Sequence, residues 1–106
     1  MHTDMDTALE ACEDALKKWC RAKLDADNAE SRHKHMTAAK IKAYTNEGGV
    51  TKAKEIVFSS DEWLESQIEV NDLMVNAAFF KGQLDQAIRV FEAARSEYSA
   101  TKRVVG

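Results

Sequence analysis

The chain has no proline, and two of its four glycines stand side by side near its middle, in the stretch "AYTNEGGVTK" (residues 43–52). Glycine adopts backbone conformations that end a helix without steric cost. The long segments on either side consist mostly of strong helix formers. Gly48 and Gly49 therefore predict two helices that are joined at this point.

The segment before the glycines predicts a first helix over residues 3–44. Its apolar residues recur at spacings of three and four, which places them on one face of a helix. This predicted face begins with Met5, Leu9, Cys12, Leu16 and Trp19 and continues through Ala22, Ala26, Ala29, Met36 and Ala43. The alanines predict that a partner helix approaches closely along this face.

Residues 45–59 are expected to form the turn and a short helical segment that begins near Thr51, and the second helix is predicted over residues 60–103. Ser59 and Glu62 have the spacing of a capping box at the start of that helix. The heptad positions after it are Val70, Leu73, Ala77, Phe80, Leu84, Ala87, Phe91, Ala94 and Tyr98. Four unbroken heptads predict coiled-coil packing.

These features predict an all-α fold, an antiparallel helical hairpin that forms a single domain over residues 1–106. Residues 1–14 and 61–72 each hold five acids and neither lysine nor arginine, whereas basic residues follow later in each half. Antiparallel helices would therefore place opposite charges side by side, and parallel helices would place like charges side by side. The predicted hairpin core consists of Val70, Leu73, Phe80, Leu84 and Phe91.

A second apolar stripe lies on another side of the second helix, and one partner helix cannot cover both stripes. An exposed patch of several large apolar side chains usually marks an interface. We expect a homo-oligomer, a dimer or higher, of which a four-helix bundle is the simplest form. The predicted oligomer contact consists of Trp63, Leu64, Ile68, Val75 and Phe79.

No motif in the chain indicates catalysis, and we predict a protein that is not an enzyme and has no cofactor or metal. The glycine pair lacks the lysine and hydroxyl residue of a phosphate-binding loop. His33 and His35 are two residues apart and point about 200° from each other on a helix, so a solvated or interface pair is favoured over a metal site. Cys12 and Cys20 would lie about 12 Å apart along a helix, too far for a disulfide.

A basic cluster in the first helix suggests nucleic-acid contact. Lys17, Lys18, Arg21 and Lys23 surround Trp19, and cations beside an aromatic ring suit single-stranded nucleic acid. The alternative is a solvated face beside a core tryptophan. The net charge of −3 argues against a general binder of polyanions.

The chain has no run of about 18 apolar residues, and its acidic start lacks the order of a signal peptide. We therefore expect a cytoplasmic protein without membrane contact.

Residues 40–103 carry a Lys-rich helix end, a Tyr–Glu–Gly-type turn, a Ser-Asp-Glu-Trp restart and an alanine-rich helix with an aromatic, Arg and Ala pattern. The residues concerned are Tyr44, Glu47, Gly48, Ser60, Glu62, Trp63, Phe80, Ala87, Phe91, Ala94 and Arg95. This region resembles small phage and prophage helical-hairpin proteins whose genes lie near recombination and replication functions. The resemblance implies an accessory protein of DNA recombination or replication in a bacterial host cell, acting on phage or host protein partners. It carries over no catalytic residues.

A second function fits the same features. A small, acidic, helical phage product is also suited to inhibit a host defence or host enzyme, as anti-CRISPR proteins do, by protein–protein binding. In that case the acidic segments 1–14 and 61–72 would cover a nucleic-acid-binding surface on the target.

Overall fold

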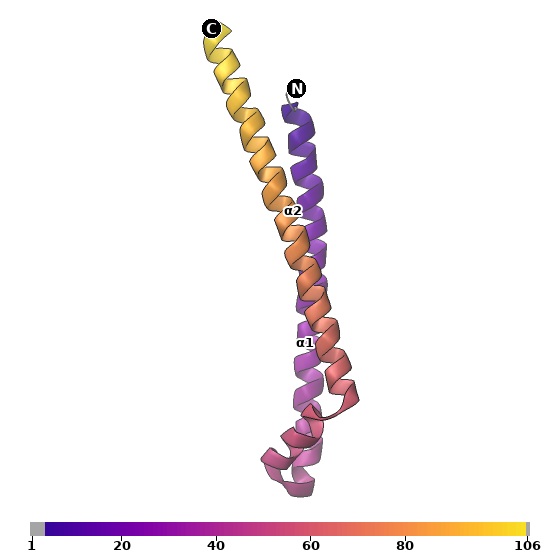
Figure 1. Cartoon of the computed structure of the whole chain (residues 1–106). Helices are drawn as coiled ribbons and strands as arrows, with labels where there is room; N and C mark the ends of the chain where they lie inside the picture. Colours follow the sequence, from indigo (N-terminus) through magenta and orange to yellow (C-terminus); the bar gives the residue numbers. More distant parts are fainter. Residues whose placement is uncertain (1–3, 106) are drawn as a thin grey trace. The chain divides into compact units, whose positions relative to one another are not determined.

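The computed structural model describes residues 4–105, with side chains described over residues 4–101. Two helices make up nearly all of this range, α1 over Met5–Phe58 and α2 over Asp61–Val105 (Figure 1). Residues 4–105 contain no strand. The all-α helical hairpin predicted from the sequence is confirmed. The predicted start of the first helix at residue 3 lies outside the described residues.

The chain divides into two compact units. We call Met1–Ala22 with Asn76–Gly106 the terminal unit, and Lys23–Val75 the hairpin unit. Each unit combines a stretch of α1 with a stretch of α2, and the reversal of chain direction falls within the hairpin unit (Figure 1). The single domain over residues 1–106 stays a prediction.

The chain reverses at Gly49, which interrupts α1 with a φ of 88° and a ψ of 173°. This combination belongs to a region of backbone space that is essentially restricted to glycine. The helix before it continues past Tyr44, where the sequence predicted its end, and includes Thr45, Asn46 and Glu47. Residues 50–58 then form a short helical segment, whose Ala53 and Val57 are fully buried.

The start of α2 differs by one residue from the capping box predicted at Ser59. The Trp63 backbone N–H donates to Ser60 Oγ over 3.2 Å, and the Ser60 hydroxyl donates to the Val57 carbonyl over 2.7 Å. Ser60 is therefore the N-cap. The Ser59 hydroxyl instead donates to the Glu55 carbonyl, 2.6 Å away, at the end of α1. The predicted box is wrong, and the Glu62 carboxylate forms an ion pair with Lys40 of α1.

The inward face of α2 follows the predicted heptad spacing. Val70, Leu84 and Ala94 are buried, and the other seam residues up to Ala94 are half-buried: Leu73, Ala77, Phe80, Ala87 and Phe91. Tyr98, the last residue of the predicted seam, is exposed. All five predicted core residues thus lie at least partly out of solvent.

The inward face of α1 differs from the predicted one. Ala8 is buried and Ala15 is half-buried, whereas Leu9 and Leu16 expose 44% and 46% of their surface. Both alternatives keep the spacing of three and four from Met5, Cys12 and Trp19, so the periodicity alone does not distinguish them. The alanines continue as Ala22, Ala26 and Ala29, all buried. Small side chains on α1 thus face the larger ones of α2, and the leucines are left outside.

We predict that Gly49→Ala lowers the free energy of unfolding by about 1–3 kcal/mol, because a Cβ is strained at this φ and ψ. The matched control is Gly48→Ala, one residue earlier in a helical conformation. There the added Cβ meets only the flexible Lys52 side chain, with Cδ at 2.6 Å, so we expect no loss or a gain of up to about 1 kcal/mol. Urea unfolding followed by circular dichroism compares the two. Equal losses at both positions would contradict this account of the reversal.

Candidate interaction surfaces

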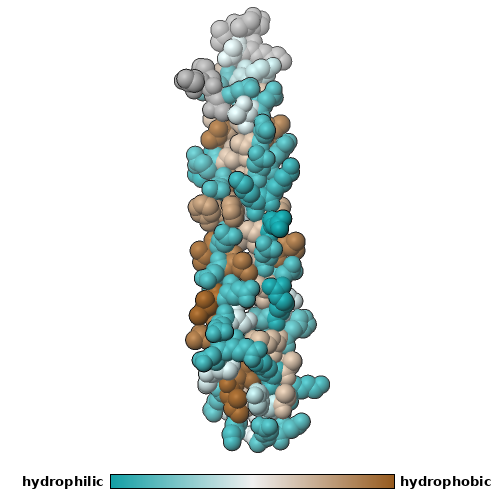
Figure 2. Space-filling model, turned by 90° about the vertical axis from the view of Figure 1, so that its right-hand side faces the viewer, coloured by the Kyte–Doolittle hydropathy of each residue, from teal (hydrophilic) through white to brown (hydrophobic). Residues whose placement is uncertain are grey.

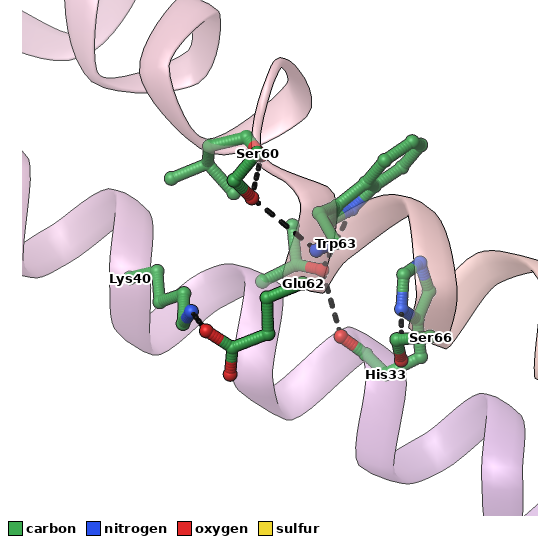
Figure 3. Close-up of polar contacts among 8 residues, drawn as sticks. His33, Lys40, Ser60, Glu62, Trp63 and Ser66 are labelled. Carbon is green, nitrogen blue, oxygen red and sulfur yellow. Dashed lines mark hydrogen bonds and ion pairs between the residues drawn. The ribbon is translucent and has the colours of Figure 1, made fainter.

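A polar cluster joins α1 to α2 inside the hairpin unit (Figure 3). His33 is buried, with 8% of its surface exposed, and its Nδ1 lies 2.8 Å from Ser66 Oγ. The centroid of the Trp63 ring lies 5.3 Å from the centroid of the His33 ring and 5.1 Å from that of the Phe58 ring. Trp63 Nε1 donates to Thr37 Oγ1 over 3.1 Å, and the Thr37 hydroxyl donates to the His33 carbonyl over 2.7 Å.

This cluster changes the interpretation of two residues. The solvated or interface pair expected for His33 and His35 is wrong for His33, which is buried, whereas His35 is exposed. Trp63 was predicted to contact another subunit, but its indole N–H and ring are engaged within its own chain. The sequence did carry a signal for His33, because it continues the buried series of Ala26 and Ala29 at the next heptad position.

The remaining residues of the predicted oligomer contact are exposed. In the hairpin unit these are Leu64, Ile68 and Val75, of which Val75 exposes 69% of its surface. In the terminal unit Phe79 exposes 59% and lies edge-on to Phe80, with ring centroids 5.4 Å apart. Figure 2 shows one face of the molecule, on which hydrophobic side chains stand among hydrophilic ones. Leu64, Ile68, Val75 and Phe79 each leave 49% or more of their surface exposed to solvent.

A shallow apolar groove lies beside Phe79 in the terminal unit. Its lining is dominated by small residues and comprises Ala11, Ala15, Ala78, Phe79, Gly82, Gln83, Gln86 and Ala87. A Cβ added at Gly82 would meet no atom within 4 Å. Packing within the chain therefore does not require glycine here, although glycine inside a helix costs about 1 kcal/mol relative to alanine.

The basic candidates for nucleic-acid contact fall into two groups. Lys17, Lys18 and Arg21 lie in the terminal unit, are exposed and form no ion pair with another described residue. Lys23 lies in the hairpin unit, where its Nζ forms an ion pair with Asp27 Oδ2 over 3.5 Å. Trp19 is half-buried, and Lys81 Nζ lies 5.0 Å from its ring centroid. One face of this ring is thus occupied by a cation of the same chain, which leaves less of it for a stacked base.

The basic residues later in α1 are paired with acids inside the hairpin unit. Lys34 Nζ lies 2.9 Å from Glu30, and the hydrogen bond and negative charge of Glu30 raise the pKa of Lys34. Arg32 Nη2 lies 4.0 Å from Glu69 Oε1 of α2, and Lys40 forms an ion pair with Glu62. These cations are less available to a phosphate than Lys17, Lys18 and Arg21.

Among the described residues, no group of three or more histidine, cysteine, aspartate or glutamate side chains is arranged to hold a metal ion. Cys12 and Cys20 are both free thiols, the first half-buried and the second exposed. Within residues 4–105, neither helix has a stretch long and apolar enough to cross a membrane.

Comparison of the chain with known protein families, with curated proteins and with solved structures found no match.

We predict that Ser66→Ala lowers the free energy of unfolding by about 1–3 kcal/mol, because it removes the bond partner of the buried His33 ring. Ser31→Ala is the matched control at an exposed site of the same unit, with an expected change within about 0.5 kcal/mol. Adding His33→Leu to Ser66→Ala should recover much of the loss, since no polar atom is then left unpaired. Denaturant titrations of the four proteins measure this, and a Ser66→Ala protein as stable as wild type would contradict it.

Proposed function

We propose that this chain is a non-enzymatic accessory protein of DNA recombination or replication that oligomerises and acts by binding partners. The observation that carries the proposal is the exposed apolar stripe of Leu64, Ile68, Val75 and Phe79. Burial of a side chain such as Phe or Val stabilises an association by about 1.5–3 kcal/mol relative to exposure. A second copy of the chain would remove this surface from water.

The setting in recombination or replication comes from the resemblance to phage helical hairpins over residues 40–103. Lys17, Lys18 and Arg21 support a contact with single-stranded DNA, because they are exposed and form no ion pair with described residues. Residues 17, 18 and 21 share one side of a helix, where three cations can follow successive phosphates.

We expect Phe79→Asp and Phe80→Asp to have different effects although they are neighbours. Phe79 is exposed and Phe80 is half-buried. Phe79→Asp should leave the helix content unchanged and separate the subunits. Phe80→Asp should lower the free energy of unfolding by at least about 3 kcal/mol, because it removes a packed ring and buries a charge. Circular dichroism and light scattering after gel filtration measure both properties, and the same outcome for both variants would contradict a distinct outer face.

We further predict that the chain binds a fluorescent single-stranded oligonucleotide, measured by fluorescence anisotropy, and that binding weakens steeply with salt because phosphate contacts release counterions. Replacing Lys17, Lys18 and Arg21 together by glutamine should abolish binding. The control replaces the paired cations Lys23, Arg32 and Lys34 by glutamine and should retain most of it. Absence of binding even at low salt would remove DNA from the proposal and leave the protein-binding role.

A second candidate is an inhibitor of a host defence or host enzyme that acts by protein–protein binding. It is favoured by the acids at the start of α2, since Asp61, Glu65 and Asp72 are exposed and form no ion pair with another described residue. Such a surface can occupy a basic groove that otherwise holds nucleic acid. Recovery of a host nuclease complex with the tagged chain, combined with absence of oligonucleotide binding, would favour this function over the first.

A further inference from the structure

A second line of residues runs along α2 outside the seam. Starting at Asp72, the positions Asp72, Val75, Phe79, Gly82, Gln86 and Arg89 follow one another in steps of three and four. All six are exposed, and they keep the heptad spacing of a helix–helix contact along Asp61–Val105. We call this line the outer stripe.

We propose that the outer stripe pairs with the outer stripe of a second copy in antiparallel orientation, about a two-fold axis between residues 80 and 81. This inference rests on the self-association proposed above and names its contact. In this register Phe79 of each copy meets Gly82 of the other, and Val75 meets Gln86. Asp72 meets Arg89 of the other copy, and the same contacts recur on the far side of the axis.

The register places the large side chain of Phe79 opposite Gly82, which has no side chain. Phe79 exposes 59% of its surface and borders the groove that contains Ala78 and Gly82. Space above Gly82 is open, since a Cβ there would meet no atom within 4 Å. A phenylalanine ring from the second copy can occupy this space and bring the two helices close. A dimer thus supplies a reason for a glycine that packing within the chain does not require.

Charge selects a second copy and the antiparallel direction. The Asp72 carboxylate has no ion-pair partner among the described residues, and Arg89 makes only a long bond of 3.4 Å from Nε to the Asp85 carbonyl. Antiparallel pairing brings these opposite charges together twice per dimer. Parallel pairing would set Asp72 against Asp72 and leave Gly82 opposite Gly82, with no ring to fill the space.

The test measures the dissociation constant of the full chain by sedimentation equilibrium, with circular dichroism as the check on folding. We expect the wild type to dimerise, and Asp72→Arg or Arg89→Asp alone to raise the dissociation constant by at least about tenfold, because each change creates two like-charge contacts. The combined variant, Asp72→Arg with Arg89→Asp, should return to near the wild-type value. Gly82→Leu should also weaken the dimer at least about tenfold, since leucine fills the space and suits a helix better than glycine.

Arg95→Asp is the matched control. Arg95 is an exposed arginine of the same helix, six residues after Arg89 and thus about 120° around the axis from the outer stripe. It should leave the dissociation constant within about twofold of wild type. A wild-type dimer that is insensitive to Asp72, Gly82 and Arg89, or one whose charge swap does not restore binding, would overturn this register while leaving self-association intact. A monomer at every concentration would overturn both.

Discussion

A pair of helices has one interior, the line along which the two helices touch, and that line holds a limited set of side chains. In α2 it takes Val70, Leu84 and Ala94 as buried residues, with Phe80 half-buried beside them. Large apolar side chains that lie off this line, such as Val75 and Phe79, stay exposed. The exposure of Val75 and Phe79 therefore follows from the limited room between the two helices, and the proposed self-association depends on this exposed surface.

The alanines of α1 add to this constraint. Ala8, Ala22, Ala26 and Ala29 are buried. Each removes little apolar surface from water, because its side chain is a single methyl group. They leave room for the larger residues of the facing helix, while Leu9 and Leu16 remain in solvent. A seam of this composition contributes less hydrophobic free energy than one lined by leucine, because that free energy scales with the apolar area buried. Polar bonds such as that between His33 and Ser66 therefore matter more in the hairpin unit than in a thick core.

The sequence predicted the parts of the fold in which only one arrangement satisfies the spacing. The α2 seam was one, because the competing series through Met74 and Ile88, which keeps the same spacing, is interrupted by the charged Lys81 and Arg95. Along α1, Ala8 and Leu9 both fit, and the choice depends on the space that α2 leaves. Ser59 and Ser60 are likewise equivalent as caps until the backbone selects one, as the bond from the Trp63 N–H to Ser60 does.

The candidate surfaces were predictable to the extent that exposure follows from the heptad. Phe79 lies off the seam and is exposed. Trp63 lies seven residues before Val70, in line with the seam, and its engagement with His33 and Thr37 follows from that position. The bond partners themselves were not predictable, because they depend on which residues of α1 come level with Trp63 once Gly49 has set the reversal.

The reversal also decides which basic residues remain free. In the hairpin unit, α1 brings Arg32 and Lys40 to the acids at the start of α2, and Glu69 and Glu62 neutralise them. In the terminal unit, Lys17, Lys18 and Arg21 have no acidic partner among the described residues. A net charge of −3 thus conceals a local cluster of cations. Glu13 and Asp14 lie one helical turn before these cations, within a Debye length of roughly 10 Å, so any contact with nucleic acid depends on direct approach of a phosphate to the three cationic side chains.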